Sequence, residues 1–152
     1  MLFRSKDTSN SATSILLQGL ASQELLANTL IWTGFTHWPE GIDGYDVMRR
    51  VGRLGDEEFI IEILPGADLR FEDDLSDFTD SEGEFCYRID ATMTGPDGIQ
   101  YRSKSNEICL SLEPVIWVPS AMMIGGNNDE FFPVISYADL SNYHLEIGRA
   151  HV

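Results

Sequence analysis

Few side chains in this sequence of 152 residues have the types and spacing that acid–base or nucleophilic catalysis needs. The histidines are His37, His144 and His151, and no Ser, Cys or carboxylate stands at a recognisable catalytic spacing from them. His37 lies beside Trp38 in a loop sequence, where packing on the protein surface explains it better than a role as a general base. We therefore expect no catalytic residue, no cofactor and no enzyme activity in this chain.

The two cysteines, Cys86 and Cys109, are the other candidates for chemistry. They could be free thiols, metal ligands or the two halves of a disulfide. A structural zinc site uses four ligands, often in closely spaced Cys pairs, so two sulfurs without a Cys-x-x-Cys motif make metal binding the weaker alternative. We expect no metal site, and the state of the two sulfurs depends on where they lie in the fold.

The cysteines lie on two alternating segments that predict a β-hairpin. Residues 85–91 place apolar side chains on one face and polar ones on the other, and residues 99–112 alternate in the same way. Between them, Asp97-Gly98 favours a tight turn in which both central residues have positive φ. A turn centred there places Cys86 opposite Cys109 on the outer face of the hairpin, which predicts a disulfide.

The same register makes two further predictions. Arg88 stands opposite Glu107 as an opposite-charge pair on the outer face, while Phe85 and Tyr87 face apolar residues of the second strand on the inner face. A disulfide in this position favours an oxidising compartment, because cytosolic thiols are kept reduced. We therefore expect the protein to be secreted or to lie on the outer cell surface.

The charge balance excludes two classes of partner. The chain has 25 acidic and 10 basic residues, a formal net charge of −15. Nucleic acids and anionic membrane surfaces attract Lys and Arg, so neither is an expected partner. No apolar run is long enough to span a bilayer, so we expect no membrane insertion. Solubility is the simplest explanation for the excess of acidic residues.

An acidic segment over residues 68–84 could hold calcium, which takes several oxygen ligands. Its spacing does not fit an EF-hand loop, so a solvated, self-repelling loop is the favoured interpretation. Asn127-Asn128-Asp129 is a similar case. The acidic residues of the segment are Asp68, Glu72, Asp73, Asp74, Asp77, Asp80, Glu82 and Glu84.

A loop with exposed aromatic residues is the candidate binding site. Trp38, which Pro39 follows, and the nearby Tyr45 could contact a glycan or a protein, as loops of β-sandwiches often do. The alternative, which we favour, is that Trp38 folds over the end of the sandwich and caps its core.

Short strands at near-regular spacing predict the fold. The expected strands are residues 15–20, 28–35, 45–49, 58–64 and 69–73, followed by the two strands of the hairpin, and residues 1–12 read as a linker or frayed end. Seven short strands over about 100 residues are typical of an all-β, two-sheet antiparallel sandwich. We expect its core to contain Trp32, Tyr45, Phe85, Tyr87 and Ile89.

Residues 13–113 resemble a fibronectin type III domain, which implies an immunoglobulin-like sandwich. Leu30-Ile31-Trp32 resembles the tryptophan motif of the second strand of that family, and residues 44–49 resemble its third strand. Phe85-x-Tyr87-Arg88-Ile89-x-Ala91 resembles the sixth strand. Phe85 departs from the pattern, because the family usually has there a buried tyrosine whose hydroxyl forms a corner hydrogen bond.

Residues 114–147 resemble the opening of the gliding motility-associated C-terminal domain, the type IX secretion sorting domain of Bacteroidetes. Val118-Pro119-Ser120-Ala121 and Asn128-Asp129-x-Phe131 match its pattern, whereas residues 122–126 depart from it. The later motifs of that family are absent, and residues 148–152 look like the translation of a sequencing adapter rather than natural sequence. The resemblance implies a truncated second β domain in a fragment of a longer protein.

Together these resemblances imply a non-catalytic extracellular spacer or interaction module of a cell-surface or gliding-motility protein. The implied partners are the type IX secretion machinery and a surface protein or glycan. Two alternatives remain open: the stalk of a secreted hydrolase whose catalytic domain lies upstream, and a carbohydrate-binding module that uses the Trp38 loop.

We also expect residues 115–147 to form a partial sheet with exposed apolar side chains. A chain that ends near Glu113 should then fold alone.

Overall fold

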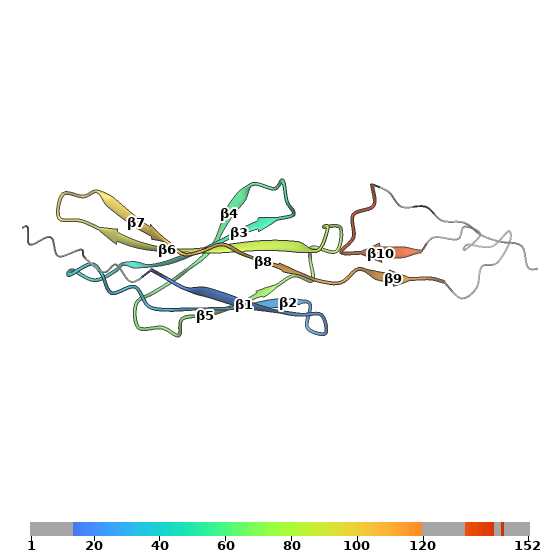
Figure 1. The fold of residues 1–152 in the computed structure, drawn as a ribbon, viewed down its shortest axis with the longest axis horizontal. Helices are drawn as coiled ribbons and strands as arrows, with labels where there is room; N and C mark the ends of the chain where they lie inside the picture. The colour runs from blue at the N-terminus through green and yellow to red at the C-terminus, as the bar shows by residue number, and fades with distance from the viewer. Residues whose placement is uncertain (1–13, 120–132, 142–143, 145–152) are drawn as a thin grey trace, which may run out of the picture.

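The computed structural model describes residues 14–119, 133–141 and 144, and all regular structure in these ranges is β-strand (Figure 1). None of the described residues forms a helix that is long and apolar enough to cross a membrane. The strands are β1 Leu17–Ser22, β2 Ala27–Trp32, β3 Gly44–Val51, β4 Glu57–Ile63, β5 Arg70–Asp74, β6 Glu84–Thr94, β7 Gln100–Lys104, β8 Ile108–Ser111, β9 Val115–Trp117 and β10 Val134–Ser136.

Strands β1 to β8 form two antiparallel sheets that face each other as an open sandwich (Figure 1). One sheet has the order β1-β2-β5, and the other has the order β4-β3-β6-β7, with β8 pairing the remaining length of β6. Each apolar strand face needs a partner surface, and stacking two sheets provides it. The all-β, immunoglobulin-like sandwich predicted from the sequence is therefore confirmed.

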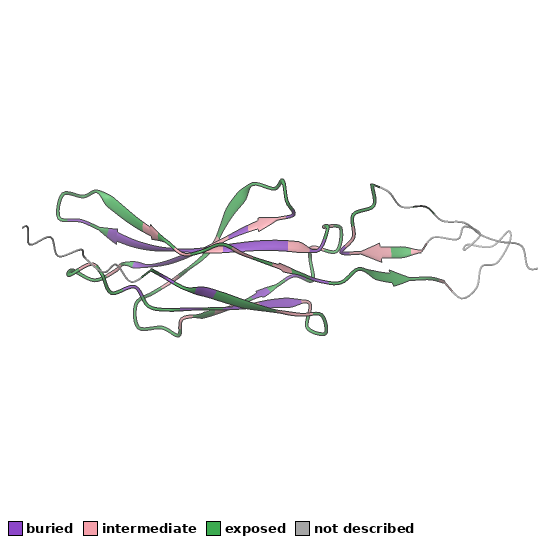
Figure 2. Ribbon diagram, in the orientation of Figure 1, coloured by how far each residue is buried: buried purple, intermediate pink, exposed green. Residues whose placement is uncertain are grey.

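The core lies between the two sheets, and β6 contributes most to it (Figure 2). Alternate residues of a strand point to opposite faces, so the apolar positions of β6 all enter the core. The five side chains predicted to pack there are buried, each with at most 4% of its surface exposed: Trp32, Tyr45, Phe85, Tyr87 and Ile89.

The predicted register is confirmed for the part of the hairpin that contains the two cysteines. Strand β6 pairs with β8 so that Cys86 lies opposite Cys109, and the two residues form a disulfide with a Cα–Cα distance of 4.0 Å. Phe85 and Tyr87 face Leu110 and Ile108 as expected.

Nearer the turn, the predicted hairpin is wrong in detail. The expected second strand is split into β7 and β8, and β7 pairs with β6 one residue out of the predicted register. Ser105 accounts for the break, because its backbone N–H bonds the Ile89 carbonyl while its hydroxyl accepts the Ile89 N–H. The turn is also longer than predicted, because the Gly95 N–H bonds the Ile99 carbonyl at 2.8 Å and leaves residues 96–98 between them. Gly98 has positive φ, whereas Asp97 does not.

Two predictions about the outer face are corrected. Arg88 does not pair with Glu107; its guanidinium bonds Asp90 and Glu57, while Glu107 pairs with Arg50 of β3. The reason is that β8 pairs β6 only as far as Tyr87, so the chain leaves the ladder before Glu107. Cys86 is also buried, with 2% of its surface exposed, and only its partner cysteine is exposed.

Strands β9 and β10 form a two-stranded ribbon that continues the long axis of the molecule beyond the sandwich (Figure 1). The ribbon confirms the expected partial sheet, because four of its five apolar side chains remain 45–61% exposed, while Ile135 is half-buried. The four exposed side chains are Val115, Ile116, Trp117 and Val134.

The chain after the ribbon returns to the sandwich through Tyr137. This side chain is 2% exposed and belongs to the core cluster. Its N–H bonds the Thr79 carbonyl at 3.0 Å, and its hydroxyl donates to the Leu75 carbonyl at 3.0 Å. Gly83, with φ of +78°, permits the approach, since a Cβ there would lie 2.9 Å from the Tyr137 carbonyl oxygen. A chain that ends near Glu113 would therefore lose one core side chain. That such a chain folds alone stays a prediction.

We expect Tyr137→Phe to lower the free energy of unfolding by about 1–2 kcal/mol, because the buried Leu75 carbonyl loses its hydroxyl donor. Urea unfolding measures the change. Tyr101→Phe is the control, since Tyr101 donates to Asp97 on the exposed surface and its loss should cost much less. Equal effects of the two substitutions would contradict an anchoring role for Tyr137.

Several sequence predictions fall outside the described residues. These are the linker over 1–12, the sorting-domain motifs over 120–131, the Asn127-Asn128-Asp129 cation site and the artefact at 148–152.

Candidate functional site

A charged network crosses the core and joins the two sheets. Period-two alternation from Tyr45 through Val47 turns Arg49 of β3 inward, towards β5 of the opposite sheet. The Arg49 guanidinium donates from Nη1 to both carboxylate oxygens of Asp73, at 2.8 and 2.9 Å. Both side chains are about nine-tenths buried or more, so water screens this pair much less than it screens a surface pair.

Two neutral side chains extend the network across the interior. The Tyr87 hydroxyl donates to the Asp73 carboxylate at 2.7 Å and accepts a hydrogen bond from the Asn28 amide at 3.0 Å. Asn28 and Asp73 come from one sheet, Tyr87 and Arg49 from the other. The network therefore ties the sheets together with directional contacts that apolar packing alone cannot supply.

Glu58 and Phe78 close the outer end of the network. Glu58 accepts hydrogen bonds from Arg49 at 2.7 and 2.9 Å, and the Phe78 ring lies 4.3 Å from the guanidinium carbon. Burial alone would lower the pKa of Arg49, but the bonds to Glu58 and Asp73 outweigh it and raise the pKa. Arg49 therefore stays charged, and the network is a closed structural element rather than a site open to substrate.

The acidic segment over 68–84 does not act as one site. Asp73 faces the core, Asp74 accepts the Ser76 N–H, and Glu72 and Glu84 pair with arginines. Among the described residues, no three of these carboxylates converge within ligand distance of one another. The alternation of Phe71, Asp73 and Leu75 towards the interior is the sequence pattern that could have revealed the buried position of Asp73.

A second cluster surrounds the disulfide. The sulfurs of Cys86 and Cys109 and a carboxylate oxygen of Glu107 all lie within 4.8 Å of one another. Arg50 of β3, the cross-strand neighbour of Cys86, donates to Glu107 Oε1 at 3.1 Å. Sequence reasoning paired Glu107 with another arginine and missed this cluster, although Glu107 and Cys109 sit two residues apart at the spacing of one strand face.

The aromatic loop does not form the exposed contact that the sequence suggested. Tyr45 is 3% exposed, and its hydroxyl accepts the Phe35 N–H at 2.7 Å inside the protein. Trp38 is half-buried against the core and meets the Phe35 ring edge-on, with 4.8 Å between centroids. His37 also lies near Phe35. The interpretation of Trp38 as a cap over the sandwich end therefore fits these contacts better than a ligand contact.

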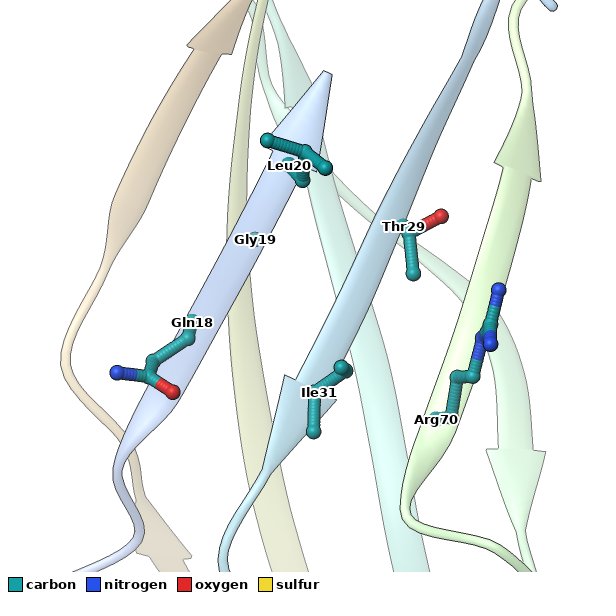
Figure 3. Close-up of a pocket in the computed structure, with 6 residues that line it drawn as sticks. All are labelled: Gln18, Gly19, Leu20, Thr29, Ile31 and Arg70. Atoms are coloured by element: carbon teal, nitrogen blue, oxygen red, sulfur yellow. The ribbon is translucent and has the colours of Figure 1, made fainter. Parts of the chain in front are cut away.

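One surface depression lies on the outer face of the three-stranded sheet (Figure 3). Residues of the neighbouring strands β1, β2 and β5 border it. Its lining is Gln18, Gly19, Leu20, Thr29, Ile31 and Arg70.

The buried network predicts a loss of stability at high pH. Burial, together with the Asp73 carboxylate, raises the pKa of Tyr87 well above its ordinary value. The protonated Tyr87 hydroxyl therefore contributes its full share to the free energy of unfolding below a pH of about 10. Above that pH, the unfolded chain loses the Tyr87 proton while the folded chain keeps it. The free energy of unfolding should then fall by about 1.4 kcal/mol per pH unit for this group.

Urea unfolding between neutral and high pH measures this slope. Burial also raises the pKa of Tyr137, and the hydrogen bond to Asp97 raises the pKa of Tyr101, so three tyrosines contribute to the slope in the unmodified chain. Tyr87→Phe should remove the part of the pH slope that comes from Tyr87 and leave the part that comes from the other tyrosines. An unchanged slope in Tyr87→Phe would show that Tyr87 ionises equally in both states.

Comparison with known proteins adds no assignment: no family model, curated protein or solved structure matches this chain. The fold, the inter-sheet network and the disulfide cluster are therefore the basis for a functional proposal.

Proposed function

We propose that this chain is a non-catalytic extracellular spacer or interaction module. The observation that carries the proposal is the position of the disulfide. It joins β8, the strand that leads towards the β9–β10 ribbon, to β6, which lies in the middle of its sheet. Force along the length of a strand loads its ladder hydrogen bonds in shear, because these bonds lie perpendicular to the strand. A covalent link between β8 and β6 prevents the two strands from sliding past each other.

The ribbon has a second attachment to the sandwich. Tyr137, just after β10, is buried in the core and hydrogen-bonded to residues 75 and 79. The chain therefore enters the ribbon beside the disulfide and leaves it through a buried tyrosine. Both strands of the ribbon are thus attached at the end where Val115 pairs with Ser136, which suits a module that transmits force along its long axis.

The resemblances to fibronectin type III and gliding motility-associated C-terminal domains extend the proposal. The sandwich would space an upstream region from the cell surface, and a complete sorting domain would be read by the type IX secretion machinery. A disulfide is compatible with an extracellular location. In this proposal the upstream region could be a hydrolase, for which this chain would be the stalk.

Single-molecule stretching of the full chain tests the spacer role. The disulfide closes a sequence separation of 23 residues, so the oxidised chain should release about 80 Å less contour length than the reduced chain. We expect the oxidised ribbon and sandwich to resist force as one unit. Cys86→Ser/Cys109→Ser is the matched control and should behave like the reduced chain.

Separation of β8 and the ribbon at the same low force in oxidised and reduced chains would overturn the spacer proposal. A glycan array probed with the full chain and with Trp38→Ala examines the carbohydrate-binding alternative. Binding that Trp38→Ala abolishes would replace the spacer proposal by that alternative.

Reduction of the disulfide should also destabilise the folded chain. Closing a loop of this length contributes about 3 kcal/mol through chain entropy, and less here because β6 and β8 are already hydrogen-bonded. Urea unfolding with and without a reductant measures the difference. Equal midpoints, after thiol quantification has verified reduction, would contradict a stabilising role.

A further inference from the structure

We propose that reduction of the Cys86–Cys109 disulfide creates a binding site for a thiophilic divalent cation, with Zn²⁺ as the biological candidate. The ligands would be the two thiolates and the Glu107 carboxylate. In the disulfide form these three groups already offer ligand atoms within 4.8 Å of one another, the only such cluster of cysteines, histidines and carboxylates among the described residues. The inference rests on this cluster and does not depend on the spacer proposal.

The geometry requires only a small rearrangement. Tetrahedral Zn²⁺ with Zn–S bonds of about 2.3 Å separates its two sulfurs by roughly 3.8 Å. Cys86 is buried and fixed in the centre of the sheet, whereas Cys109 is exposed on the outer strand. Rotation of the Cys109 side chain can therefore open the sulfurs to that separation without moving the backbone.

The third ligand is already oriented. Arg50 donates to Oε1 of Glu107, which leaves Oε2 available to the ion. Hydrogen bonds of this kind to a ligand carboxylate commonly set its position at metal sites. The fourth position would be held by water, because three protein ligands leave a tetrahedral site open.

The charges of the cluster balance. Two thiolates and one carboxylate carry three negative charges, which the Arg50 guanidinium and one divalent cation neutralise. The formal net charge of −15 adds a favourable long-range field for a cation. Soft sulfur ligands favour Zn²⁺ over the hard cations Mg²⁺ and Ca²⁺, which prefer oxygen.

The reduction step needs a dithiol as the reductant. One of its thiolates attacks Sγ of the exposed Cys109, the Cys86–Cys109 bond breaks, and Cys86 leaves as a thiolate that takes up a proton. The second thiol of the reductant then forms its own disulfide and releases Cys109. Binding of Zn²⁺ displaces one proton from each cysteine thiol, so the ion exchanges for two protons.

Titration of the full chain with Zn²⁺ and Cd²⁺ tests the proposal. The chain is reduced with dithiothreitol, freed of it by anaerobic desalting, and verified as folded by near-ultraviolet circular dichroism. We expect one ion per chain by calorimetry with Zn²⁺, and a thiolate-to-Cd²⁺ charge-transfer band with Cd²⁺. The oxidised chain should show neither signal.

Three variants locate the site. Cys109→Ser should abolish one-to-one binding and weaken the charge-transfer band. Glu107→Gln should weaken binding by more than about tenfold, since loss of an outer-shell partner alone typically costs 10–100-fold. Glu24→Gln is the matched control for nonspecific binding to carboxylates, because Glu24 is exposed in the turn after β1, and it should leave affinity unchanged.

Three outcomes would each overturn the proposal. The first is equal Zn²⁺ affinity of the oxidised and reduced chains, which assigns the binding to other groups. The second is unchanged affinity in Glu107→Gln, which removes the carboxylate from the site. The third is a reduced chain that is unfolded and that Zn²⁺ does not refold.

Discussion

Replacing Asp73 with asparagine is expected to lower the free energy of unfolding by about 3–5 kcal/mol, because the Arg49 charge loses its buried counterion. The introduced amide could still accept a hydrogen bond from the Tyr87 hydroxyl, so the effect isolates the charge rather than the shape of the site. Glu58 compensates only in part, since its carboxylate is about half exposed and already bonded to Arg49. Urea unfolding followed by circular dichroism gives the value.

The neighbouring residue provides the control. Asp74→Asn makes the same chemical change on the exposed face of β5, where the carboxylate accepts local hydrogen bonds from Ser76. It should cost much less than Asp73→Asn, as expected of a carboxylate that water already screens. Arg49→Met combined with Asp73→Asn should recover much of the stability, because no unpaired charge then remains. A loss below about 1 kcal/mol for Asp73→Asn would show that water reaches Arg49.

The sequence predicts which face of a strand each side chain lies on, but it does not predict whether a charged side chain on that face is buried and paired or exposed to water. Period two correctly turned Tyr45, Val47 and Arg49 to one side and buried the apolar positions of β6. Arg49 and Asp73 lie far apart in the chain, and each by itself resembles a solvated residue. Only the packing of β3 against β5 across the core makes them a buried pair.

The disulfide was predictable because it depends on a local hairpin, and its surroundings were not. Cys86 and Cys109 follow from alternation and turn position alone. The contact between Arg50 and Glu107 depends on β3, which lies far from the hairpin in sequence but beside β6 in the sheet. The break at Ser105 likewise depends on a side-chain hydrogen bond that has no periodic signature.

The anchoring of the tail escaped prediction for a similar reason. Tyr137 contacts the Leu75 carbonyl 62 residues earlier in the chain. Its own backbone has φ of +57°, a conformation that non-glycine residues rarely adopt and that no sequence pattern around it indicates. The predicted sorting-domain opening includes residues 114–147, and within that range Tyr137 packs into the core cluster of the sandwich.

Trp32→Ala is the second substitution with a large expected effect, a loss of about 3–5 kcal/mol from the free energy of unfolding. Trp32 is the last residue of β2, and its side chain is 4% exposed and lies edge-on to Tyr45 with 5.9 Å between ring centroids. Its removal leaves a cavity between two sheets that are fixed by their own ladders, so collapse cannot fill the space. Thermal and urea unfolding measure the loss.

Two further tryptophan substitutions distinguish cavity formation from a general loss of aromatic surface. Trp32→Phe should cost less than about 1.5 kcal/mol, because a smaller cavity forms and the Trp32 Nε1–H, which is buried without a hydrogen-bond partner in the described structure, is removed. Trp117 lies on the ribbon with 61% of its surface exposed. Trp117→Ala should therefore change the free energy of unfolding by less than about 0.5 kcal/mol, as is typical of surface substitutions. That change is about a tenth of the Trp32→Ala effect. If Trp117→Ala were as costly as Trp32→Ala, the ribbon rather than the space between the sheets would carry the core of the fold.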